Sequence, residues 1–502
     1  MRRISLIVIG MLAVWSTVGA IVPPRNMEDT TAYIQLKQAM MQNEAMNAPQ
    51  RAASIPSPRV FPRVPVIMVN YPDMTYRVSR ANVDSMFNGE HFTLYDATGS
   101  VRRYFYDQSA GQYNPQFDIY GPVSVSQNYN YYGKGNSSSR AAELVLEACA
   151  LMDDSLDFSL YDTDADGNVD LVYALFAGPP ASDGACIPSS WISNPTSVLI
   201  WPHYWTVIEA GKTGMRHVFD GKIVNDYEVS SELDGCFSTQ TTTVMAGVGL
   251  ACHEFGHGLG LPDIYPTNGA THKTCGQWDI MDYGCYNNDV RTPPGYSAYE
   301  RWFMGWLTPR LVNTPETISL QATSAGGNTI LLSPSGSHNL NGVSPSPADF
   351  FLLENRQKSG WDSYLPGAGL LVTHIRYDAN KWSGNMVNND VNAMGIDIVE
   401  ADGLAPGASQ SGYSGKPGDV FPTGATAFMG CAGYPVADIT LTNGVITFRQ
   451  TGGTSTMDEV SSMPDNGITV LYTLTGEKVT TNDNLHGVFI LMQNGKAIKI
   501  IK

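Results

Sequence analysis

The sequence predicts a mixed α/β domain over residues 61–310, an all-β sandwich domain over 311–455 and a short C-terminal β module over 456–502. The chain has 502 residues, which is too long for one compact core. Helical and strand-like patterns are mixed up to about residue 310. Beyond that point the pattern becomes alternating and rich in turn residues, as is typical of sheet proteins.

The first sixty residues contain two different segments. Two arginines are followed by the apolar run ISLIVIGMLAVW and by the small residues Val18 and Ala20, so residues 1–20 are expected to be a signal peptide. The run is shorter than the ~20 residues that span a bilayer, which argues against a membrane anchor. Residues 21–60 are polar and dotted with proline, as in a propeptide or linker. They contain no cysteine, so a thiolate from this segment cannot block a metal ion.

Residues 61–310 contain strand and helix candidates in mixed order. Buried strands are predicted where apolar or alternating runs end at turn residues: 64–73, 116–126, 171–178 and 197–205. Helices are predicted at 99–109, 139–154 and 241–261. Beyond 310, strands are predicted at 317–322, 328–334, 349–357, 369–378, 395–403 and 438–450, and short strands with Thr-Gly and Asn-Gly turns over 467–502.

Charge and cysteine content restrict the possible partners. The formal charge of −17 argues against binding to nucleic acid or anionic membranes and is compatible with divalent cations. Seven cysteines in an exported chain leave at least one unpaired. Cys275 and Cys285 would close a short loop and are the preferred pair, whereas Cys252 is expected to be a buried apolar residue.

The segment ACHEFGHGLGLPDIY carries the main prediction of chemistry. Residues four apart share a helix face, so His253 and His257 can hold one metal ion, and Glu254 lies where it can take a proton from water. Gly260 allows a left-handed exit that brings Asp263 back as a third ligand. Three ligands leave one position open, as in catalytic zinc sites. The alternative is that these histidines hold no metal.

Three further residues are candidates for this site. In GQWDIMDYG, Met281 is expected in a tight turn below the metal, although it could be an ordinary core methionine. Tyr283 could approach the metal or stabilise an oxyanion, and a structural role is equally compatible with the sequence. Glu300 is the alternative third ligand, unless it forms a salt bridge on a structural helix.

Several segments resemble the immune inhibitor A-like family of secreted bacterial metalloproteases: HEFGHGLGLPDIY, WDIMDYG and PPGYSAYERWFMGWL. SVRRYFYDQSAGQYNPQFDIYGPV and FFLLENRQKSGWDSYLPGAGLLVTHI are also similar to it, so the resemblance covers most of residues 60–450. It implies an α/β zincin-like (metzincin-type) catalytic domain with a Met-turn and an all-β region behind it. It also implies that His253, His257 and Asp263 bind zinc and that Glu254 is the catalytic base.

A second cation site is predicted in DTDADGNVD, where carboxylates alternate as in a calcium loop. The expected structural calcium ligands are Asp162, Asp164, Asp166, Asn168 and Asp170. Tyr173 stands where an EF-hand has its bidentate glutamate, so other groups would have to complete the site; the alternative is a solvated acidic turn.

Three other histidines are not expected to bind metal. His203 and His374 lie in strand-like runs and are expected to be structural. His272 could line the active site but has no motif around it.

Taken together, these patterns predict a secreted or cell-surface zinc metalloendopeptidase that is held latent by its N-terminal segment and acts on proteins or peptides. The competing hypothesis is a non-catalytic adhesion or binding protein that zinc and calcium stabilise. The segment 467–502 resembles C-terminal sorting domains of the type IX export route, which implies contact with secretion machinery; otherwise it is a last β module. No membrane span is expected in the mature chain.

Overall fold

The computed structural model describes residues 20–23, 25, 57–136, 138–333, 337–403, 415–431 and 434–451, and the backbone of four strands between 470 and 501. The predicted signal peptide, up to residue 19, as well as Pro24 and residues 26–56, lie outside the described residues. None of the described helices is long and apolar enough to cross a membrane.

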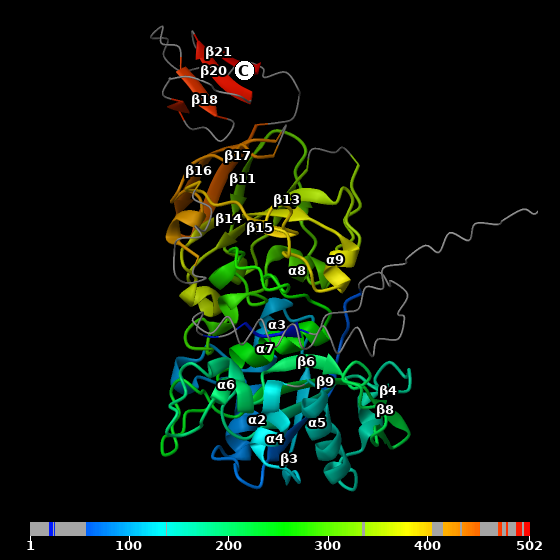
Figure 1. Ribbon diagram of the computed structural model, residues 1–502. Coiled ribbons are helices and arrows are strands. Elements are labelled where there is room, and N and C mark those ends of the chain that lie inside the picture. Colours follow the sequence, from blue (N-terminus) through cyan, green and yellow to red (C-terminus); the bar gives the residue numbers. More distant parts are fainter. Residues whose placement is uncertain are drawn as a thin grey trace, which may run out of the picture.

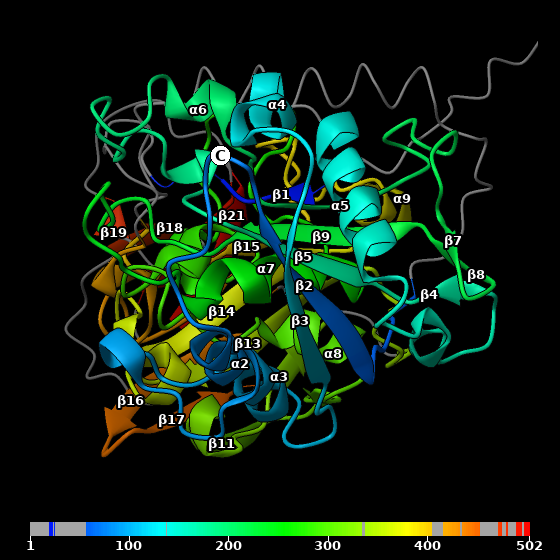
Figure 2. The same cartoon turned by 90° about the horizontal axis from the view of Figure 1, so that it is seen from below.

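A six-stranded sheet forms the centre of the first part, in the order β1-β6-β9-β5-β2-β3 (Figures 1 and 2). Strands β2, β3, β5 and β9 are parallel, and β6 runs antiparallel to β9. The bounds are β1 (Ala20–Ile21), β2 (Arg63–Asn70), β3 (Gln116–Ser124), β5 (Val172–Phe176), β6 (His203–Thr206) and β9 (Asp226–Ser231). Because β5 is buried along its whole length, it reads as a continuous apolar run.

The helices of the mixed α/β part pack against this sheet or against one another. They are α2 (Arg80–Asn88), α3 (Val101–Gln108), α4 (Tyr129–Gly133), α5 (Ser138–Met152), α6 (Pro195–Val198) and α7 (Val248–Gly258). Phe255 of α7 contacts Phe105 of α3 and Phe117 of β3, with ring centroids 4.9 and 5.3 Å apart. These edge-on aromatic contacts fix α7 against α3 and the sheet. A small separate sheet contains β4 (Asn168–Val169), β7 (Val218–Phe219) and β8 (Lys222–Val224).

Two predicted elements differ from the structure. The helix predicted over 241–261 begins only at Val248, because Gly247 is extended and Met245 pairs with Leu233 in an isolated bridge. At Gly247 a Cβ atom would lie 2.3 Å from the carbonyl oxygen of Val290, so only glycine fits this close approach. The strand predicted over 197–205 is shorter: α6 occupies its start, and β6 begins only at His203.

Residues after 310 form two antiparallel-rich sheets. The five-stranded sheet has the order β10-β12-β13-β14-β15, and the three-stranded sheet has the order β11-β17-β16. The bounds are β10 (Arg310–Leu311), β11 (Glu316–Leu320), β12 (Ile330–Leu332), β13 (Asp349–Arg356), β14 (Gly369–Arg376), β15 (Ile396–Ile398), β16 (Val436–Thr442) and β17 (Val445–Gln450). Residues of both sheets share one hydrophobic cluster.

The five-stranded sheet is buried on both faces. Phe351 and Leu353 of β13 belong to the cluster shared with β11, β16 and β17, whereas Phe350 and Leu352 belong to the core of the α/β part. Successive strand residues point to opposite faces, so this alternation places the sheet between the two cores. Helix α8 (Ala298–Phe303) packs against β13, and α9 (Ala379–Ser383) follows β14 (Figure 1).

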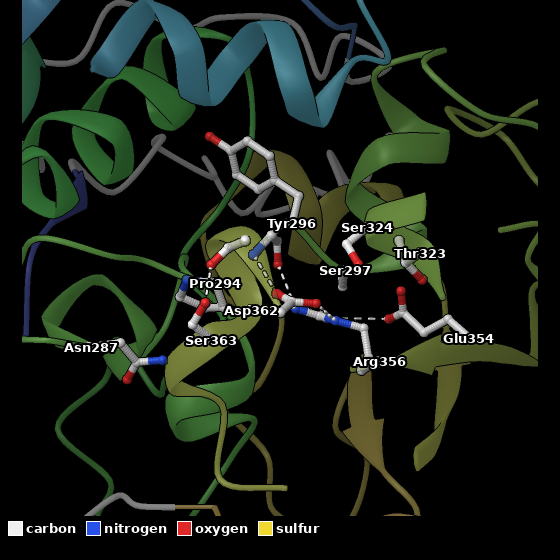
Figure 3. A network of polar contacts seen from close by, with 12 residues as sticks. Asn287, Pro294, Tyr296, Ser297, Thr323, Ser324, Glu354, Arg356, Asp362 and Ser363 are labelled. Carbon is white, nitrogen blue, oxygen red and sulfur yellow. Dashed lines mark hydrogen bonds and ion pairs between the residues drawn. The ribbon is translucent and has the colours of Figure 1, made fainter. Parts of the chain in front are cut away.

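A buried arginine joins the two parts of the chain (Figure 3). Arg356 of β13 is 1% exposed and donates two 2.7 Å hydrogen bonds to Asp362 and one of 3.1 Å to the carbonyl of Gly295. Glu354 lies 3.5 Å from the same guanidinium. Gly295 donates back to Asp362 at 3.0 Å, so this network ties the loop before α8 to the five-stranded sheet.

The disulfide predicted between Cys275 and Cys285 is wrong. Both are buried free thiols, and the structure instead joins Cys186 to Cys236 with an S–S distance of 2.05 Å. The partners lie in two loops held together by the backbone N–H of Gly235, which donates to Asp183 at 2.8 Å. Because 50 residues separate the two cysteines, local spacing could not predict the pair. Cys252 is a buried free thiol, as expected.

The C-terminal strands form a four-stranded antiparallel sheet in the order β19-β18-β20-β21. Their bounds are β18 (Val470–Thr473), β19 (Lys478–Val479), β20 (Val488–Gln493) and β21 (Lys496–Ile501).

Candidate metal centre

Helix α7 brings the two motif histidines to one point. His253 and His257 lie one helical turn apart, and their Nε2 atoms are 3.1 Å from each other. The helix ends in a Schellman motif, in which Gly260 has φ +104° and the N–H of Leu261 donates to the carbonyl of Gly256 at 3.0 Å. The reversal carries the chain back, and Oδ1 of Asp263 lies 3.3 Å from Nε2 of His253 and 3.2 Å from Nε2 of His257.

These three atoms fit a small divalent cation. For zinc at about 2.05 Å from each ligand, tetrahedral ligand atoms stand about 3.3 Å apart. The observed distances are 3.1, 3.2 and 3.3 Å. The side chains are buried, with 0%, 2% and 0% exposure for His253, His257 and Asp263, so the fit does not depend on mobile surface groups.

Hydrogen bonds orient both imidazoles for metal binding. Nδ1 of His253 lies 2.7 Å from the carbonyl oxygen of Ile280, and Nδ1 of His257 lies 2.7 Å from that of Leu261. A carbonyl only accepts, so each Nδ1 carries the proton and each Nε2 presents its lone pair. Burial, partly opposed by Asp263, lowers the pKa of His257, which favours the neutral form that binds metal.

Asn385 is a site residue that the sequence interpretation missed. Its Nδ2 donates to Oδ2 of Asp263 at 2.7 Å, and its Oδ1 accepts from the backbone N–H of Asp263 at 2.6 Å. These bonds leave Oδ1 of Asp263 directed at the histidines. Asn385 follows α9 and lies 122 residues away, so no local motif could indicate it.

Met281 lies beside helix α7, and its assignment to a Met-turn stays a prediction. Met281 is fully buried, its carbonyl accepts from the N–H of Ile264 at 2.8 Å, and its neighbour Ile280 holds His253. A Cβ on Gly256 would lie 2.8 Å from Sδ of Met281. The glycine inside the motif therefore makes room for Met281 against α7.

Glu254 is fully buried and faces the N-terminal segment of the chain. Its Oε1 accepts a 3.0 Å hydrogen bond from the backbone N–H of Val22. The indole Nε1 of Trp201 donates to the carbonyl of Val22 at 2.9 Å, and the side chain of Val22 is 0% exposed. Just before it, β1 extends the sheet by pairing antiparallel with β6. The sequence did not indicate this placement of residues 20–23.

The other candidates for this site occupy different positions. Glu300 accepts from the N–H and the hydroxyl of Ser297 in a capping box at the start of α8, at 2.7 and 2.8 Å. The structure therefore brings Asp263 rather than Glu300 to the histidines. Tyr283 begins a short 3-10 helix over Tyr283–Tyr286, with its ring 6.5 Å from that of Tyr265. A catalytic role for Tyr283 stays a prediction.

Three of the five predicted calcium ligands come together. Carboxylate oxygens of Asp162, Asp164 and Asp166 lie within 4.8 Å of one another. Asp162 is also paired with Nζ of Lys222 at 2.6 Å, so this cation would compete with calcium. Asp170 accepts from the hydroxyl of Thr163 at 2.5 Å. Asn168 donates its backbone N–H to Asp166 at 2.7 Å.

The other three candidate histidines have protein partners. Nδ1 of His203 lies 2.7 Å from the carbonyl of Trp201, and burial lowers its pKa to about 4. His374 is 2.7 Å from Asp349, and Nε2 of His272 is 2.8 Å from the carbonyl of Asn388. These contacts are compatible with the structural roles expected for His203 and His374.

Comparison with known proteins also singles out the segment that contains the histidine motif. Residues 193–307, which contain the motif, match the model of the immune inhibitor A peptidase M6 catalytic domain. The pre-pro-metalloprotease PrtV of Vibrio cholerae is 24% identical over 309 residues, covering 54% of this chain and 31% of that protein. Immune inhibitor A of Bacillus thuringiensis subsp. alesti is 26% identical over 294 residues, covering 48% of this chain and 39% of that protein. The chain thus spans about a third of the length of these relatives.

The matched segment contains both α7 with its histidines and the loop with Asp263 and Met281, and two metalloproteases are similar over about half of the chain. These matches support the resemblance of the chain to immune inhibitor A-like metalloproteases.

Proposed function

We propose that this chain is a zinc-dependent endopeptidase. The observation that supports this proposal best is the triangle of Nε2 of His253, Nε2 of His257 and Oδ1 of Asp263, with sides of 3.1 to 3.3 Å. When bound there, zinc would polarise the attacking water and the scissile carbonyl and so lower the barrier to attack.

The protein groups would perform the remaining steps. Glu254 follows His253 directly and would accept the proton of the attacking water, then deliver it to the nitrogen of the leaving amine. Its carboxylate already accepts a hydrogen bond from a peptide N–H, that of Val22, so a peptide nitrogen can reach it. The antiparallel strand β6 would bind an extended substrate by strand addition, as it does β1.

The base assignment is tested with Glu254→Gln, which keeps the shape of the side chain but removes the carboxylate. The variant should bind one zinc per chain and lose at least ~100-fold of its cleavage of denatured casein. Asp153→Asn, which alters an ion pair with Arg216, serves as a control for the change of charge. Cleavage by Glu254→Gln at the wild-type rate would disprove the assignment. The absence of any chelator-sensitive cleavage by the wild type would favour the binding-protein hypothesis.

We also propose that the N-terminal segment keeps the enzyme latent. The contact of Val22 with Glu254 supports this, because that position is then closed to substrate. Proteolytic removal of residues before about 60 should increase casein cleavage at least ~10-fold. An unchanged rate in the clipped protein would contradict latency.

The remaining predictions complete the proposal. Residues 1–20 would direct export, and the tail from about 456 would contact type IX secretion machinery. The zincin-like catalytic domain would cover residues 61–310, and a β-sandwich over 311–455 would connect it to the tail. Three carboxylates within 4.8 Å support a structural calcium ion at Asp162, Asp164 and Asp166. The substrates would be extracellular proteins.

A further inference from the structure

Three carboxylates surround the guanidinium of Arg25. Its Nη1 lies 2.8 Å from Asp234 and 3.4 Å from Asp183, and its Nη2 lies 3.2 Å from Asp289. The side chains of Asp183 and Asp234 are 2% and 0% exposed, whereas that of Asp289 is 51% exposed. We call Asp183, Asp234 and Asp289 the guanidinium site.

The guanidinium site is held rigidly by the protein around it. Asp183 accepts from the N–H of Gly235 at 2.8 Å, and Asp234 accepts from the N–H of Cys236 at 2.9 Å. The disulfide between Cys186 and Cys236 joins the two loops that carry these carboxylates. Asp183, Asp234 and Cys236 lie close enough together to hold a metal ion, but the sulfur of Cys236 is in the disulfide and is not a thiolate ligand. The cation that the structure places here is the guanidinium of Arg25.

The charges at the guanidinium site favour a cation even beside a neighbouring arginine. Arg291 lies 3.6 Å from Asp234 and 3.6 Å from Asp289. Three carboxylates and one guanidinium leave two negative charges when Arg25 is absent. Phe237 adds a ring face 5.5 Å from Cζ of Arg25. Because two of the three carboxylates are buried, a site with this charge is unfavourable unless a cation fills it.

The segment 22–25 contacts Glu254 through Val22 and the guanidinium site through Arg25, three residues further on. The segment is aligned by β1 on β6, by the N–H of Val22 on Glu254, and by the N–H of Arg25 on the carbonyl of Ser182 at 3.1 Å. The nitrogen of Val22 occupies the position where a leaving amine would receive its proton. Val22 therefore stands for the first residue after a scissile bond, and Arg25 for the residue three positions further.

We propose that the guanidinium site is a specificity subsite that binds an arginine side chain of the substrate, three residues beyond the residue that follows the scissile bond. The substrates are then proteins with a small apolar residue after the cleaved bond and an arginine at that further position. Residues 22–25 of the chain itself present this pattern. The inference rests on the proposed endopeptidase function.

The test uses the chain carrying Arg25→Gln after proteolytic removal of residues before about 60, so that neither the N-terminal segment nor an arginine in residual uncleaved chain competes for the site. Two quenched fluorescent peptides contain Ile-Val-Pro-Pro-Xaa and differ only at Xaa, which is arginine or its neutral isostere citrulline. The ratio of kcat/KM for the arginine peptide to that for the citrulline peptide should be at least about 10. The guanidinium of arginine forms charge-assisted hydrogen bonds with the buried carboxylates, and the neutral citrulline cannot form them. Adding Asp234→Asn should reduce the ratio to about 2 or less.

Matched variants separate the subsite from general effects of charge. Asp289→Asn removes a half-exposed partner and should change the ratio by less than about threefold. Asp153→Asn, at the Arg216 ion pair, should leave the ratio unchanged. Because both peptides are measured on one preparation, the ratio does not depend on the fraction of folded enzyme, so a destabilised variant still gives a result.

A ratio near 1 in the Arg25→Gln chain, or a ratio that Asp234→Asn leaves unchanged, overturns the inference. If neither peptide is cleaved even after residues before about 60 are removed, the endopeptidase proposal is what fails. The subsite is then tested by fluorescence polarisation with uncleaved labelled peptides on the Arg25→Gln, Glu254→Gln chain. At least ~10-fold tighter binding of the arginine peptide, lost with Asp234→Asn, supports the subsite, and equal affinities refute it.

Discussion

Removal of the Asn385 side chain should weaken metal binding without touching a ligand. Asn385 is 5% exposed, has φ +51°, and holds Asp263 by hydrogen bonds of 2.6 and 2.7 Å. Glycine accepts this backbone conformation, so Asn385→Gly removes the two hydrogen bonds without adding strain. Free of its partner, the carboxylate of Asp263 loses its fixed orientation toward the histidines.

The size of this effect follows from the position of Asn385 behind the ligand. Loss of such a partner typically lowers metal affinity about 10- to 100-fold, which is about 1.4 to 2.7 kcal/mol. The Kd for zinc is measured by competition with a chromophoric chelator at pH 7.5. Asn389→Gly is the control, because Asn389 lies in the same loop but accepts from Thr267 at 2.7 Å instead of contacting Asp263.

Two results would refute this reasoning. One is a Kd of Asn385→Gly within threefold of the wild-type value. The other is an equal loss of affinity in Asn389→Gly, which would indicate that the loop as a whole, and not the bond to Asp263, matters. Thermal unfolding of the metal-free proteins shows whether either variant is generally destabilised.

Three further predictions concern stability. Gly249→Ala should cost about 1 to 3 kcal/mol in urea unfolding, because its Cβ would lie 2.0 Å from the carbonyl oxygen of Cys285; an unchanged midpoint would show that α7 can shift. His203 has a pKa of about 4 in the fold and an ordinary value of 6.5, so the unfolded state takes up its proton first and stability falls as the pH drops from 6.5 to 4. At about 1.4 kcal/mol per pH unit, His203→Asn should remove about 3 kcal/mol of this loss, and parallel stability curves of the two proteins would contradict the assignment. Arg356→Met should destabilise the protein by about 3 to 5 kcal/mol, because Asp362 stays buried without its cation, whereas Glu354 keeps its ion pair with Arg301; a neutral effect would show that the remaining hydrogen bond from Gly295 is enough for Asp362.

Local sequence predicts local geometry well in this chain. His253, His257 and Asp263 lie within eleven residues, so one helix and one glycine exit are enough to bring their ligand atoms together. Strands such as β2 and β14 are also evident from their own residues, because burial on one or both faces imposes a recognisable pattern. That these ligand atoms bind zinc stays a prediction.

Contacts between distant segments could not be predicted in the same way. Asn385 reaches Asp263 across 122 residues, and Cys186 reaches Cys236 across 50. Each of these residue types is common and has many possible partners, so nothing in its neighbourhood specifies which one the fold selects. The preference for Cys275 with Cys285 failed for this reason, since short spacing does not ensure that two thiols face each other.

The position of Asn385 has a practical consequence for anyone who expresses part of this chain. The similarity to the peptidase domain ends at residue 307, and a gene fragment cut there would still encode both histidines and Asp263. It would lack the amide that steadies the aspartate and would leave one side of α8 without the strand β13 that covers it. Such a fragment would carry the whole recognisable motif and yet is expected to be a poor metalloenzyme.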